Sequence, residues 1–388
     1  MSADFAKARR VLIPLAFVNF TVGVGAFVPI SLLAPLSQSL SLSKAQAGWV
    51  MGVYALAYAV SSPILVSISG GLRRRSVILT GLALFVAGGL ATAFVRDASA
   101  LFAVRIAAAI GAGLVTPVAA AIAVAISSPE ERGKALSTVF IGMTLAQVLG
   151  VPGGAFVGYT FGVAAALIGA AALGALAWIW VAVSVPADVA FQPQSLGTLG
   201  RTLMSPRHLV AVLLTVTIST SGYLGMTFTG PLAEYRLGMG RDGVALFFAA
   251  GGLGGFVGNL VAGRITDRLG PSRTLLICLI GNCVLTPALT LVPFNLPGGL
   301  LINFLWCAFG WGFTVPQQAR LMAIDPKTQG VMLALNAAGI YLGGGIGSSL
   351  AGAVYERWGL EMTGVVGGAI ALFGVAHLIL SDRLARRG

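Results

Sequence analysis

The sequence has little charge. Only 9% of its 388 residues are charged and just 12 are Asp or Glu, whereas soluble domains carry about 25% charged residues. Hydrophobic residues make up 57% of the chain. A chain this apolar cannot keep a water-facing surface, so its solvent must be lipid. The composition therefore excludes an ordinary soluble protein and predicts an all-α membrane protein.

Cysteine and histidine are also scarce. Cys278, Cys283 and Cys307 all fall in apolar segments, and the only histidines are His208 and His377. These residues form neither a disulfide framework nor a metal-ligand pattern, so no metal or cofactor is expected. No cluster of His, Cys, Asp and Glu suits chemistry within a membrane, so we do not expect an enzyme or a membrane-embedded scaffold.

Long hydrophobic runs are what the chain has in quantity. A spanning helix needs about 20 mainly apolar residues, and twelve windows meet that length. They are 11–34, 46–69, 76–95, 98–126, 135–159, 162–185, 209–231, 243–265, 274–294, 298–323, 331–354 and 364–380. The first run follows a basic N-terminus and could mimic a secretory signal, but it is too long for one.

The two sets of six spans repeat each other. Gly111 to Pro117 resembles Gly310 to Pro316, and Gly142 and Gly150 match Gly339 and Gly347 at similar offsets. Parallel repeats of this kind are typical of transporters that bind substrate between their halves. The longest polar break lies between the sets. We predict an N-terminal half over 1–185, a cytoplasmic linker over 186–208 and a C-terminal half over 209–388.

Lysine and arginine placement predicts the orientation. With the N-terminus in the cytoplasm, 18 of the 24 Lys and Arg residues fall in cytoplasmic segments and five outside, while Arg105 lies within a helix. Cytoplasmic loops are enriched in Lys and Arg, so both termini are predicted to be cytoplasmic. The net charge of +12 is spread over short loops and forms no basic stripe, so nucleic acid is not an expected partner.

One loop carries a recognisable motif. The segment between the eighth and ninth spans reads Gly-Arg-Ile-Thr-Asp-Arg-Leu-Gly-Pro-Ser-Arg over 263–273. It resembles the loop signature of the major facilitator superfamily, and the resemblance covers essentially the whole chain. The equivalent loop after the second span keeps Arg73, Arg74 and Arg75 but has Gly70 in place of the aspartate. These arginines could also serve only to set topology. The resemblance implies a gating role for Arg74, Arg75, Arg132, Lys134, Gly263, Asp267, Arg268, Gly270 and Arg273.

Two further spans strengthen the resemblance. The fourth span carries Arg105, which is costly inside a membrane unless paired, although it could reach back to the interface instead. The fifth span resembles the signature of the drug/proton antiporter branch, with a valine inserted, at Gly142, Gly150, Pro152, Gly153 and Gly154. The family packs the fifth span on the eighth and the second on the eleventh, although generic helix packing would also explain these glycines. Other segments are similar to the arabinose-efflux-like subgroup.

The family fold implies which spans line the substrate cavity. A single Asn or aromatic residue in a span more often joins helices or faces lipid, but as a set on these spans such residues are candidates for substrate contact. They are Asn19, Phe20, Tyr54, Tyr58, Arg105, Gln147, Tyr223, Asn303, Trp306, Trp311 and Asn336. All twelve acidic residues lie outside the middle of the spans, and Glu234 is the acid nearest the cavity. Arg105 and Glu234 are therefore the candidate coupling residues.

We expect a monomeric inner-membrane exporter of a small molecule such as a sugar, nucleoside, other metabolite or drug, working by alternating access and linked to protons. The missing buried acid keeps an alternative open, which is an uncoupled facilitator or importer of a neutral or anionic solute. In both cases the partners are the substrate and the lipid bilayer.

Overall fold

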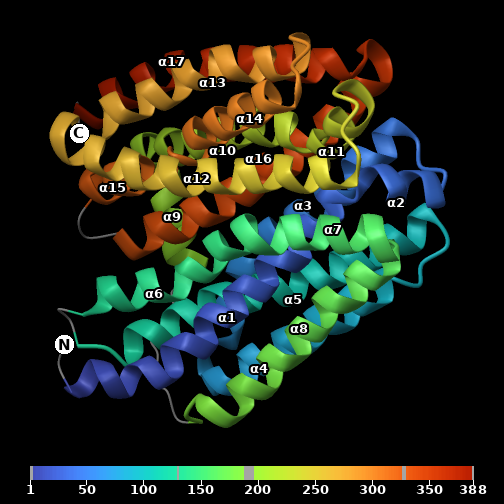
Figure 1. Ribbon diagram of the computed structural model, residues 1–388. Coiled ribbons are helices and arrows are strands. Elements are labelled where there is room, and N and C mark those ends of the chain that lie inside the picture. The colour runs from blue at the N-terminus through green and yellow to red at the C-terminus, as the bar shows by residue number, and fades with distance from the viewer. Residues whose placement is uncertain (1–2, 129–130, 188–195, 326–328, 387–388) are drawn as a thin grey trace.

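The fold is a bundle of long helices. The computed structural model describes residues 3–128, 131–187, 196–325 and 329–386. In Figure 1 both termini lie at one end of the bundle, which we call the terminal end, and the opposite end is the distal end. Twelve straight or broken helices of the described residues are long and apolar enough to cross a membrane. Each overlaps one predicted window, so the predicted fold class is confirmed.

The first six spans form the N-half, the lower group in Figure 1. A short helix follows the first span, and a π-helical turn interrupts the fifth. The elements are α1 (Ala3–Ser31), α2 (Leu33–Ser39), α3 (Lys44–Ile68), η1 (Ser69–Gly71), α4 (Arg74–Thr92), α5 (Ala98–Ala125), α6 (Arg132–Leu145), η2 (Ala146–Gly150), α7 (Val151–Phe161) and α8 (Val163–Ser184).

The last six spans form the C-half above it. The seventh span breaks near its distal end, and the tenth breaks midway. The elements are α10 (Pro206–Met226), α11 (Thr229–Pro231), η3 (Leu232–Arg236), α12 (Arg241–Leu269), α13 (Pro271–Leu291), α14 (Leu296–Trp311), α15 (Thr314–Ile324), α16 (Gln329–Trp358) and α17 (Leu360–Arg386). The predicted linker contains α9 (Leu196–Met204), while 188–195 lie outside the described residues.

Proline accounts for the broken spans. Pro152 cannot donate a backbone hydrogen bond, and the π-turn η2 stands directly before it. Pro316 cannot donate to the carbonyl of Gly312, where α14 ends and α15 begins. The π-turn η2 lies against Gly252 of the C-half, whereas Gly312 packs against residues of α12 within its own half.

Two glycines show the internal repeat in three dimensions. Gly162 ends the fifth span with φ of 95°, and Gly359 ends the eleventh with φ of 92°. Residues with a side chain rarely adopt this backbone conformation. Gly162 and Gly359 are equivalent positions, since each follows the fifth span of its half. The repeat in the sequence is therefore also a repeat of backbone geometry.

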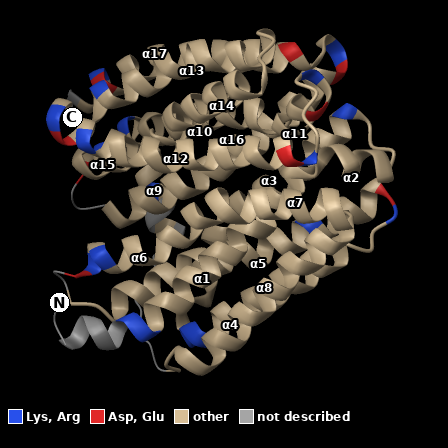
Figure 2. Cartoon of the chain, in the orientation of Figure 1, with Lys and Arg blue, Asp and Glu red and all other residues tan. Residues whose placement is uncertain are grey.

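Charge is confined to the two ends of the bundle. Figure 2 shows the blue and red segments gathered at the terminal and distal ends, with the middle almost entirely tan. Among the described residues, Arg105 is the exception that matters, since it is 2% exposed inside α5.

Candidate transport site

Arg105 joins three helices of the N-half. Its Nη1 donates to the carbonyl of Gly25 at 3.0 Å, and its Nη2 to that of Ala26 at 3.2 Å, both on α1. Its Nε donates to the carbonyl of Val50 on α3 at 3.3 Å. The guanidinium carbon also stands 4.3 Å from the centre of the Tyr54 ring. The side chain therefore turns inward, and an arginine reaching back to the interface does not describe this structure.

A proline in α1 explains why Arg105 is needed there. The Gly25 carbonyl would normally accept from the N–H of residue 29, but that residue is Pro29 and has none. A buried carbonyl without a donor is costly, and a guanidinium carries five donors. Arg105 thus supplies the donor that Pro29 removes. It acts on the backbone of α1 and α3 in this conformation, with Tyr54 covering one face of the guanidinium.

Aromatic side chains from both halves meet at the centre. Tyr58 on α3 stacks on Tyr341 on α16, with ring centroids 3.6 Å apart. Trp311 on α14 contacts Phe27 on α1 edge-on at 6.4 Å and Tyr223 on α10 at 6.3 Å. Tyr341 was not among the predicted site residues. The sequence did contain a sign of its place, because Tyr341 is an aromatic residue in the glycine-rich eleventh span. The family packs that span against the second span.

A small pocket lies between α10 and α14. It encloses about 30 Å³ and is lined by aromatic, small and sulfur-containing side chains without a charge. Trp306 forms one wall and is fixed because its Nε1 donates to Thr286 Oγ1 at 2.9 Å. Trp311 forms another, so the pocket borders the contact between the halves. Gly222 and Gly310 also line it and leave room where side chains would stand.

The predicted amides bond to their own half rather than to the pocket. Asn19 donates to the Val139 carbonyl at 3.2 Å, and Asn303 to the Phe247 carbonyl at 2.6 Å. Asn336 accepts from Thr215 Oγ1 at 2.7 Å. Each bond joins two spans, which is the usual work of a polar group in a membrane helix.

The two remaining candidates lie on the first and fifth spans. Phe20 stacks on Phe17 at 5.9 Å and packs with a cluster of residues from η2, α7 and α8. Gln147 lies in η2, where its backbone meets α12 at Gly252. The structure therefore groups Tyr54, Tyr58, Tyr223, Trp306 and Trp311 around the centre and sets the other candidates apart.

Among the described residues, four hydrogen bonds join the halves at the distal end. Tyr159 Oη donates to Glu234 Oε2 at 2.9 Å, which places Glu234 in a contact between α7 and η3. The other three are as follows. Gln38 Nε2 donates to Tyr235 Oη at 2.6 Å, Ala45 N to Glu356 Oε2 at 2.9 Å, and Arg241 Nη1 to Thr160 Oγ1 at 3.5 Å. We call these four contacts the distal gate, and it is closed. Of its residues, sequence reasoning singled out Glu234 alone, because the other bonds depend on how the halves meet.

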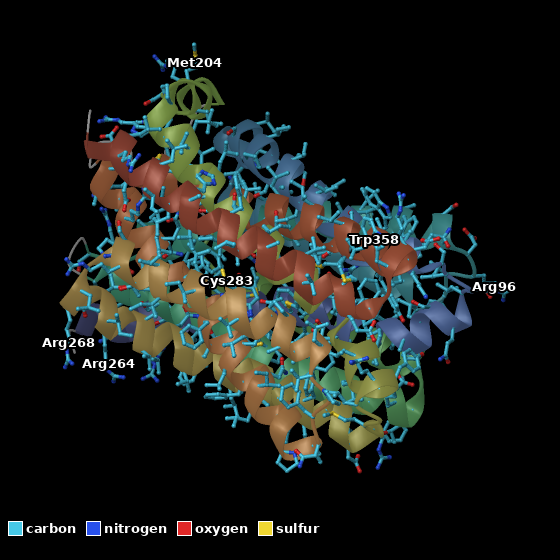
Figure 3. The ribbon with its side chains drawn as sticks, turned by 90° about the horizontal axis from the view of Figure 1, so that it is seen from above. Arg96, Met204, Arg264, Arg268, Cys283 and Trp358 are labelled. Atoms are coloured by element: carbon cyan, nitrogen blue, oxygen red, sulfur yellow. The ribbon has the colours of Figure 1, made fainter. Side chains whose placement is uncertain are left out.

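The loop motif at the terminal end is not engaged in this way. Asp267 is exposed and makes no hydrogen bond or ion pair with the described residues, and a Cβ at Gly133 would face open space. Figure 3 shows Arg264 and Arg268 extending from one end of the molecule, with Arg96 and Trp358 at the other. In the N-half, Arg75 donates to the carbonyl of Ala182 and so joins α4 to α8 within that half.

Comparison with known proteins identifies this architecture. The sequence model of the Major Facilitator Superfamily matches residues 15–323. The chain belongs to the major facilitator superfamily. An MFS-type transporter, YbcL of Bacillus subtilis, is 30% identical over 376 residues, with 94% of each chain covered. The inner membrane transport protein YdhP of Escherichia coli is 25% identical over 378 residues, with 97% of each covered.

Solved structures share the fold. A bacterial homologue of the human lysosomal transporter Spinster, in an inward-facing and unoccupied conformation, superposes with a TM-score of 0.81 at 17% identity, covering 100% of this chain and 99% of that one. A mutant of the nucleoside transporter NupG gives 0.75 at 14% identity, with 97% and 99% covered. The chain is thus a multi-pass membrane transporter that works by alternating access on a small-molecule substrate.

The spans of this superfamily member pair across the halves as expected, but through different glycines. A Cβ at Gly252 would lie 2.4 Å from the Gln147 carbonyl, so the fifth and eighth spans touch closely there. The expected fifth-span glycines instead face α1, where Gly142 meets Ala16 and Gly150 meets Val24. The prediction that they face the eighth span was wrong, because the π-turn directs the contact through the backbone of η2.

The second and eleventh spans also pair across the halves, and here too only some of their glycines form the contact. Gly48 meets Ser348 and Gly352 of α16, as expected for the second span. On α16, however, Gly345 faces Leu56 of α3, while Gly343 meets the Val216 carbonyl of α10. A glycine-rich helix with two close neighbours needs glycine on both sides, and sequence alone does not say which side is which.

Proposed function

We propose that this transporter exports a small, uncharged or weakly anionic molecule from the cytoplasm in exchange for protons. The observation that carries the substrate class is the centre of the molecule. Tyr58 from one half and Trp306 and Trp311 from the other surround it without any acidic side chain. No carboxylate of the described residues stands there to neutralise a buried cation, and aromatic faces bind flat apolar groups. Sugars, nucleosides, other metabolites and uncharged drugs stay within this class.

The export direction rests on the fifth span. Its segment from Gly150 to Gly154 resembles the antiporter signature of the drug/proton antiporter branch, and other segments resemble the arabinose-efflux-like subgroup. The π-turn before Pro152 supports a hinge in this span, since such turns often mark functional bends. We treat residues 1–185 and 209–388 as two domains that rock about the centre, within one monomer.

The orientation rests on charge. The Lys and Arg bias assigns the terminal end, with both termini, to the cytoplasm of a bacterial cell and the protein to the inner membrane. The described conformation is then closed toward the outside, because the distal gate joins the halves on that side. Substrate would enter from the cytoplasm and contact Tyr58, Tyr223, Trp306 and Trp311.

Proton coupling is assigned to the distal gate. Glu234 accepts from Tyr159 across the two halves, and hydrogen bonds to a charged carboxylate are stronger than those to a neutral one. A proton that reaches Glu234 from outside would weaken this bond and favour opening, which is when an exporter releases its cargo. Arg105 is the second candidate, although its donors are directed to backbone carbonyls in this conformation.

An uncoupled facilitator or importer is the alternative that one observation favours. Every described Asp and Glu lies near an end of the bundle, so no carboxylate in the middle can carry a proton across.

Proton movement distinguishes the antiporter from the facilitator. Purified protein would be screened by thermal shift against sugars, nucleosides, amino acids and uncharged drugs. The compound that stabilises it would then be added to proteoliposomes containing a pH-sensitive dye.

Antiport predicts that substrate moving one way drives protons the other way, with a change of internal pH that needs the protein. Substrate flux without any pH change would establish the facilitator and overturn coupling.

The pocket glycines test the site itself. Gly222→Ala and Gly310→Ala each add one methyl group at the pocket lining, and neither new Cβ would come closer than 3.7 Å to an atom of another segment. Filling so small a space should raise the half-saturating substrate concentration about tenfold, which is 1.4 kcal/mol. Gly169→Ala adds the same methyl on α8, also in open space, and is the matched control. Equal affinities in all three variants would place substrate elsewhere.

A further inference from the structure

A second pocket lies at the distal end and has walls from both halves. Its volume is about 230 Å³, several times that of the central pocket. The N-half contributes residues of α2 and α3, among them Ser37, Gln38 and Lys44. The C-half contributes Tyr235 and Tyr355. None of these residues was a predicted substrate contact, and one bonded pair of the distal gate, Gln38 and Tyr235, lines the pocket itself.

The lining is suited to an amphipathic anion. The floor is apolar and includes Leu33, Phe228 and Pro231. At the rim the exposed Lys44 ammonium stands 4.6 Å from the centre of the Tyr355 ring and supplies a positive charge. Ser37 Oγ is buried and has no hydrogen-bond partner among the described residues, which is unusual for a buried polar atom. A hydroxyl without a partner and an ammonium that makes no ion pair with the described acids, both beside apolar surface, select a ligand with a carboxylate at one end and an apolar group at the other.

Neighbouring charges do not cancel this preference. Glu356 lies close to this rim, and its Oε2 accepts from the backbone N–H of Ala45, the residue that follows Lys44. Glu234 accepts from Tyr159. Gln38 donates to Tyr235 Oη, which ties the two halves across the pocket.

We propose that this pocket binds small amphipathic carboxylates and that binding holds the distal gate closed. The pocket exists only while α2 and α3 stand against η3 and α16, so opening the gate would separate its walls. A ligand that binds one of two states shifts the equilibrium toward that state by its binding factor. At a concentration ten times its Kd, the ratio of gate-closed to gate-open molecules should rise about 11-fold. Such a ligand would slow transport without entering the central pocket.

Distances between spin labels test this directly. Arg96 and Trp358 belong to different halves, lie outside the pocket and stand at the same end of the molecule in Figure 3. Labels on Arg96→Cys and Trp358→Cys, in protein with Cys278, Cys283 and Cys307 replaced by Ala, report the gate by double electron–electron resonance. The probe is 3-phenylpropionate, and 3-phenylpropionamide is its uncharged counterpart.

The carboxylate should increase the short-distance population, and the amide should need at least a tenfold higher concentration for the same shift. Lys44→Gln should remove the difference between the two probes, whereas Arg357→Gln, which removes a nearby exposed charge that does not line the pocket, should keep it. An unchanged distance distribution with 3-phenylpropionate would overturn the proposal. So would a response that persists fully in Lys44→Gln, because the anion would then act elsewhere.

Discussion

The two halves share one fold but hold their helices together differently. In the N-half, the buried side chain of Arg105 satisfies carbonyls on α1 and α3. In the C-half, uncharged groups do comparable work, since Gln317 donates to the Ala211 carbonyl and to Thr215 Oγ1, each at 2.9 Å. The C-half keeps its buried charge at the terminal end, where Arg320 donates to Asp382 at 2.8 Å.

This difference shows how a duplicated fold divides its tasks. The half that contains Arg105 has a fixed polar centre, and the half with the broken tenth span provides the uncharged aromatic pocket. The loops differ as well, because the C-half has Asp267 where the N-half has Gly70. Each difference can be removed by one or two substitutions.

The largest effect is expected at Arg105. Arg105→Ala leaves the Gly25 carbonyl without a donor and removes the link between α1, α3 and α5, so transport should be abolished while the protein still reaches the membrane. Arg105→Lys should recover only part of the activity, since one ammonium cannot reach three carbonyls with the same geometry. Transport is measured in proteoliposomes, and the amount of folded protein by size-exclusion chromatography.

The C-half provides the comparison for that experiment. Gln317→Leu removes an uncharged link of similar position and should lower transport less than Arg105→Ala does, because no proline-orphaned carbonyl depends on it. If Arg105→Ala and Arg105→Lys both transport like the parent protein, the arginine is a packing element and the proposed role of the N-half centre is wrong.

The next effect concerns the loops at the terminal end. When that end closes, Asp267 should meet the start of α6, where unsatisfied N–H groups and the helix dipole favour a carboxylate by about 0.3–2 kcal/mol. Exposed Arg132 stands at the same place. In the described conformation the contact is absent, as expected if it forms only on closure. Losing about 1–2 kcal/mol should shift a balanced equilibrium five- to thirty-fold.

Asp267→Asn should therefore increase the population open at the terminal end, and Gly70→Asp, which restores the missing acid of the N-half loop, should decrease it. Spin labels at Arg10→Cys and Arg383→Cys report that end, and the 96–358 pair should change in the opposite sense. Unchanged distances in Asp267→Asn would mean that Asp267 is a solvated loop charge and closes nothing.

The sequence predicted the features that depend only on neighbouring residues, and it did not predict contacts between segments far apart in the chain. Each span needs only its own apolar residues, so all twelve were found, and the breaks at Pro152 and Pro316 are properties of proline itself. The partner of Arg105 required knowing that α1 passes beside α5. The distal gate required knowing how two halves meet, and Tyr159 carries no local sign of its bond to Glu234. Amides such as Asn303 were predicted to face substrate because polarity alone does not distinguish a cavity from a helix contact.

A smaller effect is expected at Glu234. Glu234→Gln keeps the shape of the side chain but removes its charge, so the bond from Tyr159 should weaken and the dependence of transport on a pH gradient should fall several-fold. Tyr159→Phe removes the same bond from the other half and is the matched partner variant. Flux is measured at fixed substrate with and without an imposed gradient. A steep gradient dependence that survives Glu234→Gln would exclude this residue from coupling.

The smallest effect again contrasts the two loops. Gly270 joins α12 to α13 with φ of 83° and ψ of 163°, a conformation that is essentially confined to glycine. The N-half loop makes its turn without a positive φ, and a Cβ at Gly71 would face open space. Gly270→Ala should therefore lower the free energy of unfolding by about 1–3 kcal/mol, while Gly71→Ala should leave it nearly unchanged.

Thermal unfolding in detergent measures the stability of both variants side by side. Transport per folded molecule should be preserved in each, since neither glycine touches the centre. Equal melting temperatures would mean that the C-half loop relaxes around the new side chain, and the contrast between the loops would then reside in Asp267 alone.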